Sequence, residues 1–293
     1  MKLLELCEQV EADLDASGVF FGHGTDNAFD EAVWLVCSAA DIDLATDEDL
    51  PWEQEIEKSA MDSVDALLKK RIETGKPLAY LLNEAWFAGE KFYIDERAII
   101  PRSHLGEWIP DKFEPWLLNP EPARILDLCT GSGCIAIALA LTFDSAAVDA
   151  ADLSEDALAV ARENRRRFGL ESRLNLLHGD LFAPVAGNRY DLIVCNPPYV
   201  SEALMQDLPG EYEFEPGLAF LGGESGLDLV NQILLKARGF LNPGGVLVME
   251  VGSANHALEK FHADVPFTWL SSENEDAAVF LISAEELEQY FSG

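Results

Sequence analysis

The stretch that decides the fold is Asp127-Leu128-Cys129-Thr130-Gly131-Ser132-Gly133, which we call the glycine turn. It lies between the apolar run 123–128 and the helical run 134–142, so we predict a connection from a buried strand to a helix. Gly131 and Gly133 let the backbone approach a ligand closely, and the start of the helix presents unpaired N–H groups. The turn is not Gly-x-Gly-x-x-Gly and has no Gly-Lys-Ser/Thr, so neither a dinucleotide pyrophosphate nor a nucleoside triphosphate is indicated.

An acidic residue at the end of the next strand favours a nucleoside ligand. The run 146–151 predicts that strand, and Asp152 follows it, 21 residues after Gly131. A carboxylate at this place can accept both hydroxyls of a ribose. Asp149 falls within the strand and is the second candidate. The plainer alternative is a tight strand–helix turn with a surface aspartate, and the next motif argues against it.

That motif is Asn196-Pro197-Pro198-Tyr199, which follows the apolar run 190–195 and which we call the amide motif. It would lie at the carboxyl end of a strand, where open α/β sheets place their ligands. An amide or aryl nitrogen is a poor nucleophile because its lone pair is delocalised. A site that methylates such a nitrogen must hold its two hydrogens and direct the lone pair at the methyl group.

The amide motif offers the groups for this task. The Asn196 side-chain oxygen and the Pro197 carbonyl can accept the two hydrogens, and consecutive prolines fix the backbone. Tyr199 can pack over the flat amide. These hydrogen bonds strengthen as positive charge develops on nitrogen, so they favour the transition state. A proline-capped end of a strand is the alternative interpretation.

The rest of the sequence indicates a helical region followed by a hairpin, and then a region in which strands and helices alternate. Residues 1–75 predict helices, and 78–100 predict strand-forming sequence with a β-hairpin turn at Ala88-Gly89-Glu90. Beyond residue 123, further strands are predicted at 174–177, 190–195, 244–251, 267–270 and 277–282, and further helices at 154–168 and 226–241. Repeated βα units with an antiparallel finish predict an α/β fold with a mostly parallel, doubly wound sheet.

The excess of acidic residues limits the kinds of partner that the protein can bind. Of 293 residues, 53 are Asp or Glu and 20 are Lys or Arg, which gives a formal charge of −33. This charge argues against a broad phosphate-binding surface and against anionic membranes. Either a salty cytoplasm or a basic protein partner would explain the acids. We prefer the first, because the acids are spread along the whole chain.

The cysteines and histidines indicate a reduced protein without a metal. The five cysteines include no Cys-x-x-Cys pair, which favours a cytoplasmic location. The five histidines lack metal-ligand spacing, so we expect no metal.

Several stretches together resemble a known family. The glycine turn, Asp152, Gly179-Asp180 and the amide motif resemble the S-adenosylmethionine-dependent class I methyltransferases. The stretches 97–102, 215–219 and 223–227 narrow the resemblance to the protein-(glutamine-N5) methyltransferases. The branch that acts on ribosomal protein L3 of the large subunit is most similar, at 84–89, 101–103, 106–107 and 266–270. The branch that acts on release factors usually has Pro-Arg-Pro-Glu-Thr-Glu at 101–106.

The resemblance implies a domain organisation and roles for residues. It implies a helical substrate-recognition domain at 1–75, a β-hairpin linker at 76–104 and a Rossmann-like catalytic domain with a seven-stranded sheet at 105–293. The residues implied to bind S-adenosylmethionine are Cys129, Thr130, Gly131, Ser132 and Gly133 at the methionine part, Asp152 at the ribose, and Asp180 and Leu181 at the adenine. The residues implied to bind the substrate glutamine are Arg102, Asn196, Pro197, Pro198 and Tyr199, of which Asn196, Pro197 and Tyr199 are catalytic.

The implied activity is N5-methylation of a glutamine in ribosomal protein L3, free or in early assembly particles, by direct transfer. The alternatives are a release-factor glutamine methyltransferase, an adenine-N6 methyltransferase of nucleic acid, and a non-catalytic nucleoside-binding factor. Two positions depart from the family pattern. His104 stands where proline is common, and we expect a slacker loop there. Leu82-Asn83 replaces Thr-Gly, and we expect an altered hairpin turn.

Overall fold

The structure is a computed structural model that describes residues 1–44, 50–270 and 278–291. It divides into two compact units, and we describe each by itself. The first unit comprises Met1–Glu96, Ile100–Arg102 and Pro209–Glu215. The second comprises Arg97–Ile99, Ser103–Leu208 and Pro216–Gly293. The predicted division into a recognition domain at 1–75, a linker at 76–104 and a catalytic domain at 105–293 assigns functions to these parts, and it stays a prediction.

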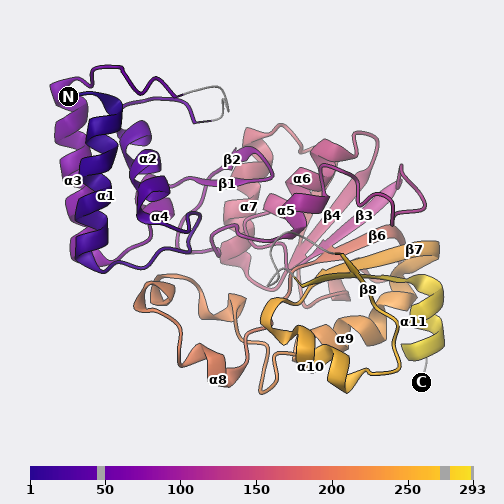
Figure 1. The fold of residues 1–293 in the computed structure, drawn as a ribbon. Coiled ribbons are helices and arrows are strands. Elements are labelled where there is room, and N and C mark those ends of the chain that lie inside the picture. The colour runs from indigo at the N-terminus through magenta and orange to yellow at the C-terminus, as the bar shows by residue number, and fades with distance from the viewer. Residues whose placement is uncertain (45–49, 271–277, 292–293) are drawn as a thin grey trace. The chain divides into compact units, whose positions relative to one another are not determined.

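The first unit is built from helices and one hairpin (Figure 1). Its elements are α1 (Leu3–Ser17), α2 (Ala28–Ala39), α3 (Lys58–Thr74), α4 (Leu78–Leu82), β1 (Ala85–Phe87) and β2 (Glu90–Phe92). The apolar face of α1 is buried, as the spacing of its leucines predicts. Asn27 caps α2 by accepting from the backbone N–H of Asp30 at 2.9 Å. Gly75 ends α3 in the left-handed region, with φ of 68°.

Residues 78–82 correct one expectation. The sequence predicts an extended segment here, because Tyr80 is a strand former, but these residues form the short helix α4. Pro77 precedes its first turn, Leu and Ala are good helix formers, and Tyr80 is buried on the helix. The predicted hairpin is confirmed just beyond it, since Ala88 and Gly89 both have positive φ and Trp86 pairs with Lys91.

The second unit contains a seven-stranded sheet of order β5-β4-β3-β6-β7-β9-β8. Its strands are β3 (Arg124–Leu128), β4 (Ala147–Asp152), β5 (Leu174–His178), β6 (Tyr190–Cys195), β7 (Leu241–Glu250), β8 (Thr268–Leu270) and β9 (Val279–Ser283). The pairs among β3 to β7 are parallel, whereas β9 runs antiparallel to both β7 and β8. The predicted mostly parallel sheet with an antiparallel finish is confirmed. Residue 277 of the last predicted strand lies outside the described residues.

The second unit also contains seven α-helices among the described residues. They are α5 (Leu105–Trp108), α6 (Cys134–Thr142), α7 (Glu155–Arg167), α8 (Glu202–Met205), α9 (Asp228–Ala237), α10 (Asn255–Phe261) and α11 (Ala284–Phe291). The helix predicted at 154–168 is confirmed as α7, and Ser154 caps it, because its Oγ accepts from the N–H of Ala157 at 3.1 Å. The helix predicted at 226–241 is shorter than expected, since β7 already begins at Leu241.

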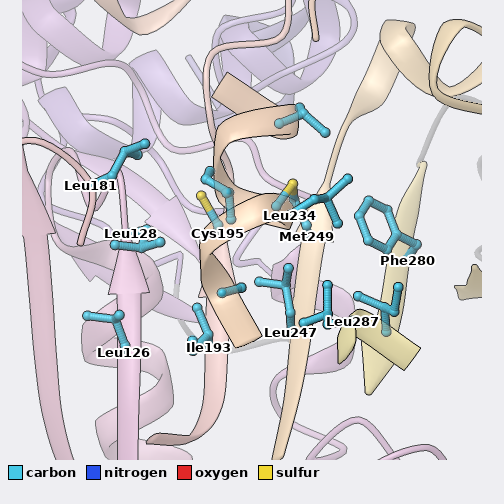
Figure 2. Packing of buried hydrophobic residues seen from close by; sticks show 14 of the residues in the cluster. Leu126, Leu128, Leu181, Ile193, Cys195, Leu234, Leu247, Met249, Phe280 and Leu287 are labelled. Carbon is cyan, nitrogen blue, oxygen red and sulfur yellow. The ribbon is translucent and has the colours of Figure 1, made fainter. Parts of the chain in front are cut away.

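One face of the sheet carries a cluster of buried apolar residues. Figure 2 shows alternate residues of three strands in one cluster with Leu234 of α9, namely Leu126, Leu128, Ile193, Cys195, Leu247 and Met249. Leu287 of α11 and Phe280 of β9 complete this cluster. The spacing of two residues follows from the pleat of a strand, which turns alternate side chains to the same face. The close packing of these side chains holds the ends of the strands in place.

Two further features concern the cysteines and the lengths of the helices. All five cysteines lie among the described residues and are free thiols. Within the same residues, no helix has the length and apolar character needed to cross a membrane.

Candidate active site

The two sequence motifs lie at the ends of neighbouring strands. β3 and β6 are parallel, and Leu128 is paired with Cys195. The next residues along the two strands are Cys129 of the glycine turn and Asn196 of the amide motif. β4 flanks β3 and β7 flanks β6, so the sheet changes its direction of winding between β3 and β6. Such a switch point is where open α/β sheets form ligand sites at their carboxyl edge.

The two glycines of the glycine turn have different surroundings. Both have positive φ, 55° at Gly131 and 81° at Gly133. A Cβ added to Gly133 would lie 3.1 Å from Cβ of Ala161, so this glycine permits close packing of α6 on α7. Among residues 1–44, 50–270 and 278–291, a Cβ added to Gly131 would have only Ile99 Cγ2 within 4 Å, at 3.8 Å. Gly131 therefore leaves open space above the turn, as a bound ligand requires.

Cys129 also has positive φ, 58°, which is unfavourable for a residue with a side chain. Neighbouring hydrogen bonds hold the turn in this shape. The N–H of Thr130 donates to the Ala151 carbonyl at 3.1 Å, and Asn164 Nδ2 donates to the Ser132 carbonyl at 2.9 Å. Strained backbone that is held by its surroundings is typical of functional sites.

Asp127 brings a buried carboxyl group beneath the turn. It is fully buried, and burial raises its pKa to about 7, although the hydrogen bond from Thr130 opposes this rise. Among the described residues its Oδ1 has no hydrogen-bond partner. A buried acceptor without a partner favours a ligand that carries positive charge or N–H groups.

Asp152 joins the glycine turn to β4. Its Oδ2 accepts from the N–H of Gly131 at 2.8 Å, and its Oδ1 accepts from the N–H of Ser154 at 2.8 Å. Each carboxylate oxygen can accept a further hydrogen bond. Burial raises the pKa of this half-buried carboxyl, and the backbone donors partly offset that effect. The side chain thus remains able to accept from hydroxyl groups.

Asp149 is already engaged by other side chains. It accepts from Arg124 Nη2 at 3.0 Å, from the Tyr190 hydroxyl at 2.7 Å and from Asn175 Nδ2 at 2.9 Å. It lies three residues before the carboxyl end of β4. This geometry supports Asp152 over Asp149 as the ribose acceptor.

The residues predicted to flank the adenine lie beside Asp152. The N–H of Gly179 donates to the Asp152 carbonyl at 2.9 Å, which places the turn after β5 next to β4. Asp180 is exposed, whereas Leu181 is buried with a φ of 45°. The glycine turn, Asp152 and residues 179–181 therefore follow one another along the carboxyl edge.

The amide motif is held tightly at its tyrosine. Asn196 is half-buried and Pro197 is buried. The Tyr199 hydroxyl donates to Glu250 Oε1 at 3.0 Å. A Cβ added to Gly252 would lie 2.5 Å from the Tyr199 ring. Sequence reasoning missed Glu250 and Gly252. Their one signal was their position at the end of a predicted strand.

Arg102 belongs to the first unit, whereas the other predicted site residues belong to the second. Its guanidinium binds Glu215 with two hydrogen bonds of 2.8 Å. Burial alone would raise the pKa of Glu215, but His23 and Arg102 lower it to about 2. The role of Arg102 toward substrate stays a prediction.

The slacker loop expected at His104 stays a prediction. The backbone N–H of His104 donates to Glu250 Oε2 at 3.0 Å. Proline at this position would have no N–H, so the departure adds a hydrogen bond.

The strand order, the antiparallel β9 and the glycine turn after β3 define a class I methyltransferase. A family model described as "Methyltransferase small domain" matches residues 115–208. The ribosomal protein uL3 glutamine methyltransferase of Burkholderia pseudomallei is 46% identical over 91% of this chain and 89% of its own. Proteins of the same name from Neisseria gonorrhoeae and Bordetella pertussis are 45% and 42% identical, over 92% and 97% of this chain and 90% and 96% of their own. The chain belongs to the family of ribosomal protein uL3 glutamine methyltransferases.

S-adenosylmethionine is the methyl donor of these enzymes, and the site fits it in three respects. The space above Gly131 is open, the Asp152 carboxylate can accept further hydrogen bonds, and Asp127 has an acceptor without a partner among the described residues. Carboxylates suit a ligand that carries a sulfonium and an ammonium group.

We predict that Asp152→Ala weakens S-adenosylmethionine binding by roughly 1.5–3 kcal/mol, the range for hydrogen bonds to a charged group. Calorimetric titration measures the affinity. Asp156→Ala is the control, since it removes an exposed acid of the same charge nearby. Unchanged affinity in Asp152→Ala would move the ribose contact elsewhere, with Asp149 as the next candidate.

We predict that Asp127 makes the stability depend on pH. Its pKa is about 7 in the folded protein and ~3.9 in an unfolded chain. The folded state therefore binds more protons between these values, and the free energy of unfolding falls as pH rises from about 4 to about 7. Asp127→Asn removes this contribution. Urea unfolding of both proteins over that range tests it, and parallel pH curves would contradict the assignment.

Proposed function

We propose that the protein transfers the methyl group of S-adenosylmethionine to the side-chain nitrogen of a glutamine in ribosomal protein uL3. The observation that carries this proposal is the pairing of Leu128 with Cys195, which sets the glycine turn beside the amide motif. The names of the relatives supply the substrate. The sequence identity between these relatives and this chain extends over about nine-tenths of each chain, which supports assigning the same substrate to this protein.

The first part of the proposal assigns the cofactor. Residues 129–133 hold the methionine part, Asp152 holds the ribose, and Asp180 and Leu181 flank the adenine. When bound, the cofactor supplies an electrophilic methyl group on a positively charged sulfur. The negative charge of the nearby carboxylates favours that cation.

The second part assigns the substrate amide. The Asn196 side-chain oxygen and the Pro197 carbonyl accept the two hydrogens of the amide nitrogen, and the Tyr199 ring packs over the amide plane. These contacts strengthen as the nitrogen becomes positive, so they lower the barrier to transfer. No base is needed before transfer, because the proton can leave to water once the nitrogen is cationic.

The third part concerns the form of the substrate. The first unit exposes several acids around the connection from α2 to α3, namely Asp41, Asp43, Glu53, Glu55 and Glu57. Residues 47–49, which add three more acids, lie outside the described residues. A chain with a charge of −33 attracts a basic protein and repels a phosphate-rich particle. We therefore propose that uL3 is methylated in the cytoplasm, free or in early assembly particles.

We predict that Asn196→Ala lowers kcat on uL3 by on the order of a hundredfold or more, the effect of losing a preorganised hydrogen-bonding group. The affinity for S-adenosylmethionine should change little, because the lost contact is made to the substrate. Single-turnover kinetics and calorimetry separate the two quantities. Asn119→Ala, at an exposed asparagine of the same unit, is the control. Near-normal turnover in Asn196→Ala would show that the amide motif does not hold the amide.

We predict strong labelling of free uL3 and weak labelling of mature large subunits and of release factors. The rate on free uL3 should fall as salt rises, because screening weakens electrostatic attraction. Circular dichroism in the same salt series controls for folding. Equal labelling of mature subunits and free uL3 would overturn the proposed form of the substrate, and preferred labelling of release factors would overturn the substrate itself.

A further inference from the structure

A buried carboxylate lies directly beside the amide motif. Glu250 is the last residue of β7, and the preceding Met249 is paired with Cys195 of β6. Glu250 is therefore the neighbour of Asn196 across the two strands. It is only 1% exposed. A buried carboxylate is costly unless several donors bind it, so its presence at this place needs an explanation.

Three donors bind the two oxygens of Glu250. Oε1 accepts from the Tyr199 hydroxyl at 3.0 Å. Oε2 accepts from Ser103 Oγ at 2.6 Å and from the His104 N–H at 3.0 Å. Burial raises the pKa of Glu250, and these same donors oppose the rise. One side chain thus links the tyrosine of the amide motif to residues almost a hundred positions earlier in the chain.

The ring of Tyr199 is confined by glycines as well. A Cβ at Gly252 would lie 2.5–2.8 Å from its Cε2, Cζ and Oη atoms. A Cβ at Gly226 would lie 2.3 Å from its backbone oxygen, and one at Gly222 would lie 2.8 Å from its Cα. These glycines allow the close approach of the chain around Tyr199, but they offer no directional bond. The direction of the hydroxyl is set by Glu250.

We propose that Glu250 is a positioning residue of the methyltransferase. Its carboxylate accepts hydrogen bonds from the Tyr199 hydroxyl on one side and from Ser103 and His104 on the other, and this link sets where the tyrosine ring lies over the substrate amide. The proposal rests on the proposed function of the amide motif. Glu250 touches neither cofactor nor substrate in this scheme, and it acts through Tyr199.

Ser103, which donates to Glu250, lies where the chain passes into the second unit. Ser103 begins a segment of that unit, directly after Arg102 of the first. Glu215 binds the Arg102 side chain and the Ile100 N–H within the first unit. Two buried glutamates therefore hold adjacent residues, Arg102 and Ser103, each within its own unit. Ser103 and His104 belong to the same unit as Glu250 and Tyr199, so Glu250 holds Tyr199 from within that unit.

A double-mutant cycle with Glu250→Gln and Tyr199→Phe tests this role. The glutamine of the first variant can still accept from Ser103 and His104 through its amide oxygen, but its NH₂ group then faces the Tyr199 oxygen. The direction of that hydrogen bond is reversed and the charge is lost. We expect kcat on free uL3 to fall about tenfold, the difference between a charge-assisted and a neutral hydrogen bond. The dissociation constant of S-adenosylmethionine should change by less than about twofold, since the cofactor contacts remain.

The cycle distinguishes positioning from a general effect on folding. In the Tyr199→Phe background, Glu250→Gln should lower kcat by less than about twofold further, because the bond it alters is already absent. Unchanged kcat in Glu250→Gln would overturn the proposal, and so would the full loss repeated in the Tyr199→Phe background. If the wild-type protein labels no uL3, the proposed function has failed instead. Should Glu250→Gln not fold, Ser103→Ala takes its place, and an additive loss with Tyr199→Phe would then contradict the proposal.

Discussion

The structure of the site depends on the parallel pairing of β3 with β6. The pairs run from Ile125 with Leu192 to Leu128 with Cys195, without a shift. Each strand contributes alternate residues to the cluster that packs on α9 (Figure 2). A slip by one residue would turn those side chains to the opposite face. The burial of this cluster therefore fixes the register, and the register sets the glycine turn beside the amide motif.

Carboxyl groups that are buried or half-buried hold the two motifs at the ends of the strands. Asp152 binds the Gly131 N–H and Glu250 binds the Tyr199 hydroxyl, so each motif is held by an acid from the strand next to its own. Asp127 adds a buried acid under the turn. Burying these groups costs free energy, which hydrogen bonds from backbone and hydroxyl donors offset. Preorganised groups of this kind are what a transfer reaction to a weak nucleophile requires.

Much of this could be predicted from the sequence, because the relevant signals are local. Apolar runs with glycine or proline at their ends predicted the strands of the parallel sheet, and the helical run 154–168 predicted α7. The repeated βα units predicted a mostly parallel sheet, but the order of its strands came only from the structure. The placement of Asp152 ahead of Asp149 followed from its position at the end of its strand.

Other features were missed for physical reasons. The helix α11 is only eight residues long and lies after the last strand, yet Ser283 and Glu286 form a capping box that could have indicated it. The helix α4 is short, and its tyrosine is a strand former elsewhere. The role of Glu250 could not be found, because its partners Ser103 and Tyr199 are distant in sequence and meet only through the fold.

The central claim is that a glutamine side-chain nitrogen receives the methyl group. The most direct test is incubation of the protein with S-adenosylmethionine and free uL3, followed by fragmentation mass spectrometry of the uL3 peptides. The account predicts one added methyl group, located on the side-chain amide nitrogen of a glutamine. A methyl group on a lysine, an arginine or the N-terminus, or on ribosomal RNA in a parallel reaction, would contradict it.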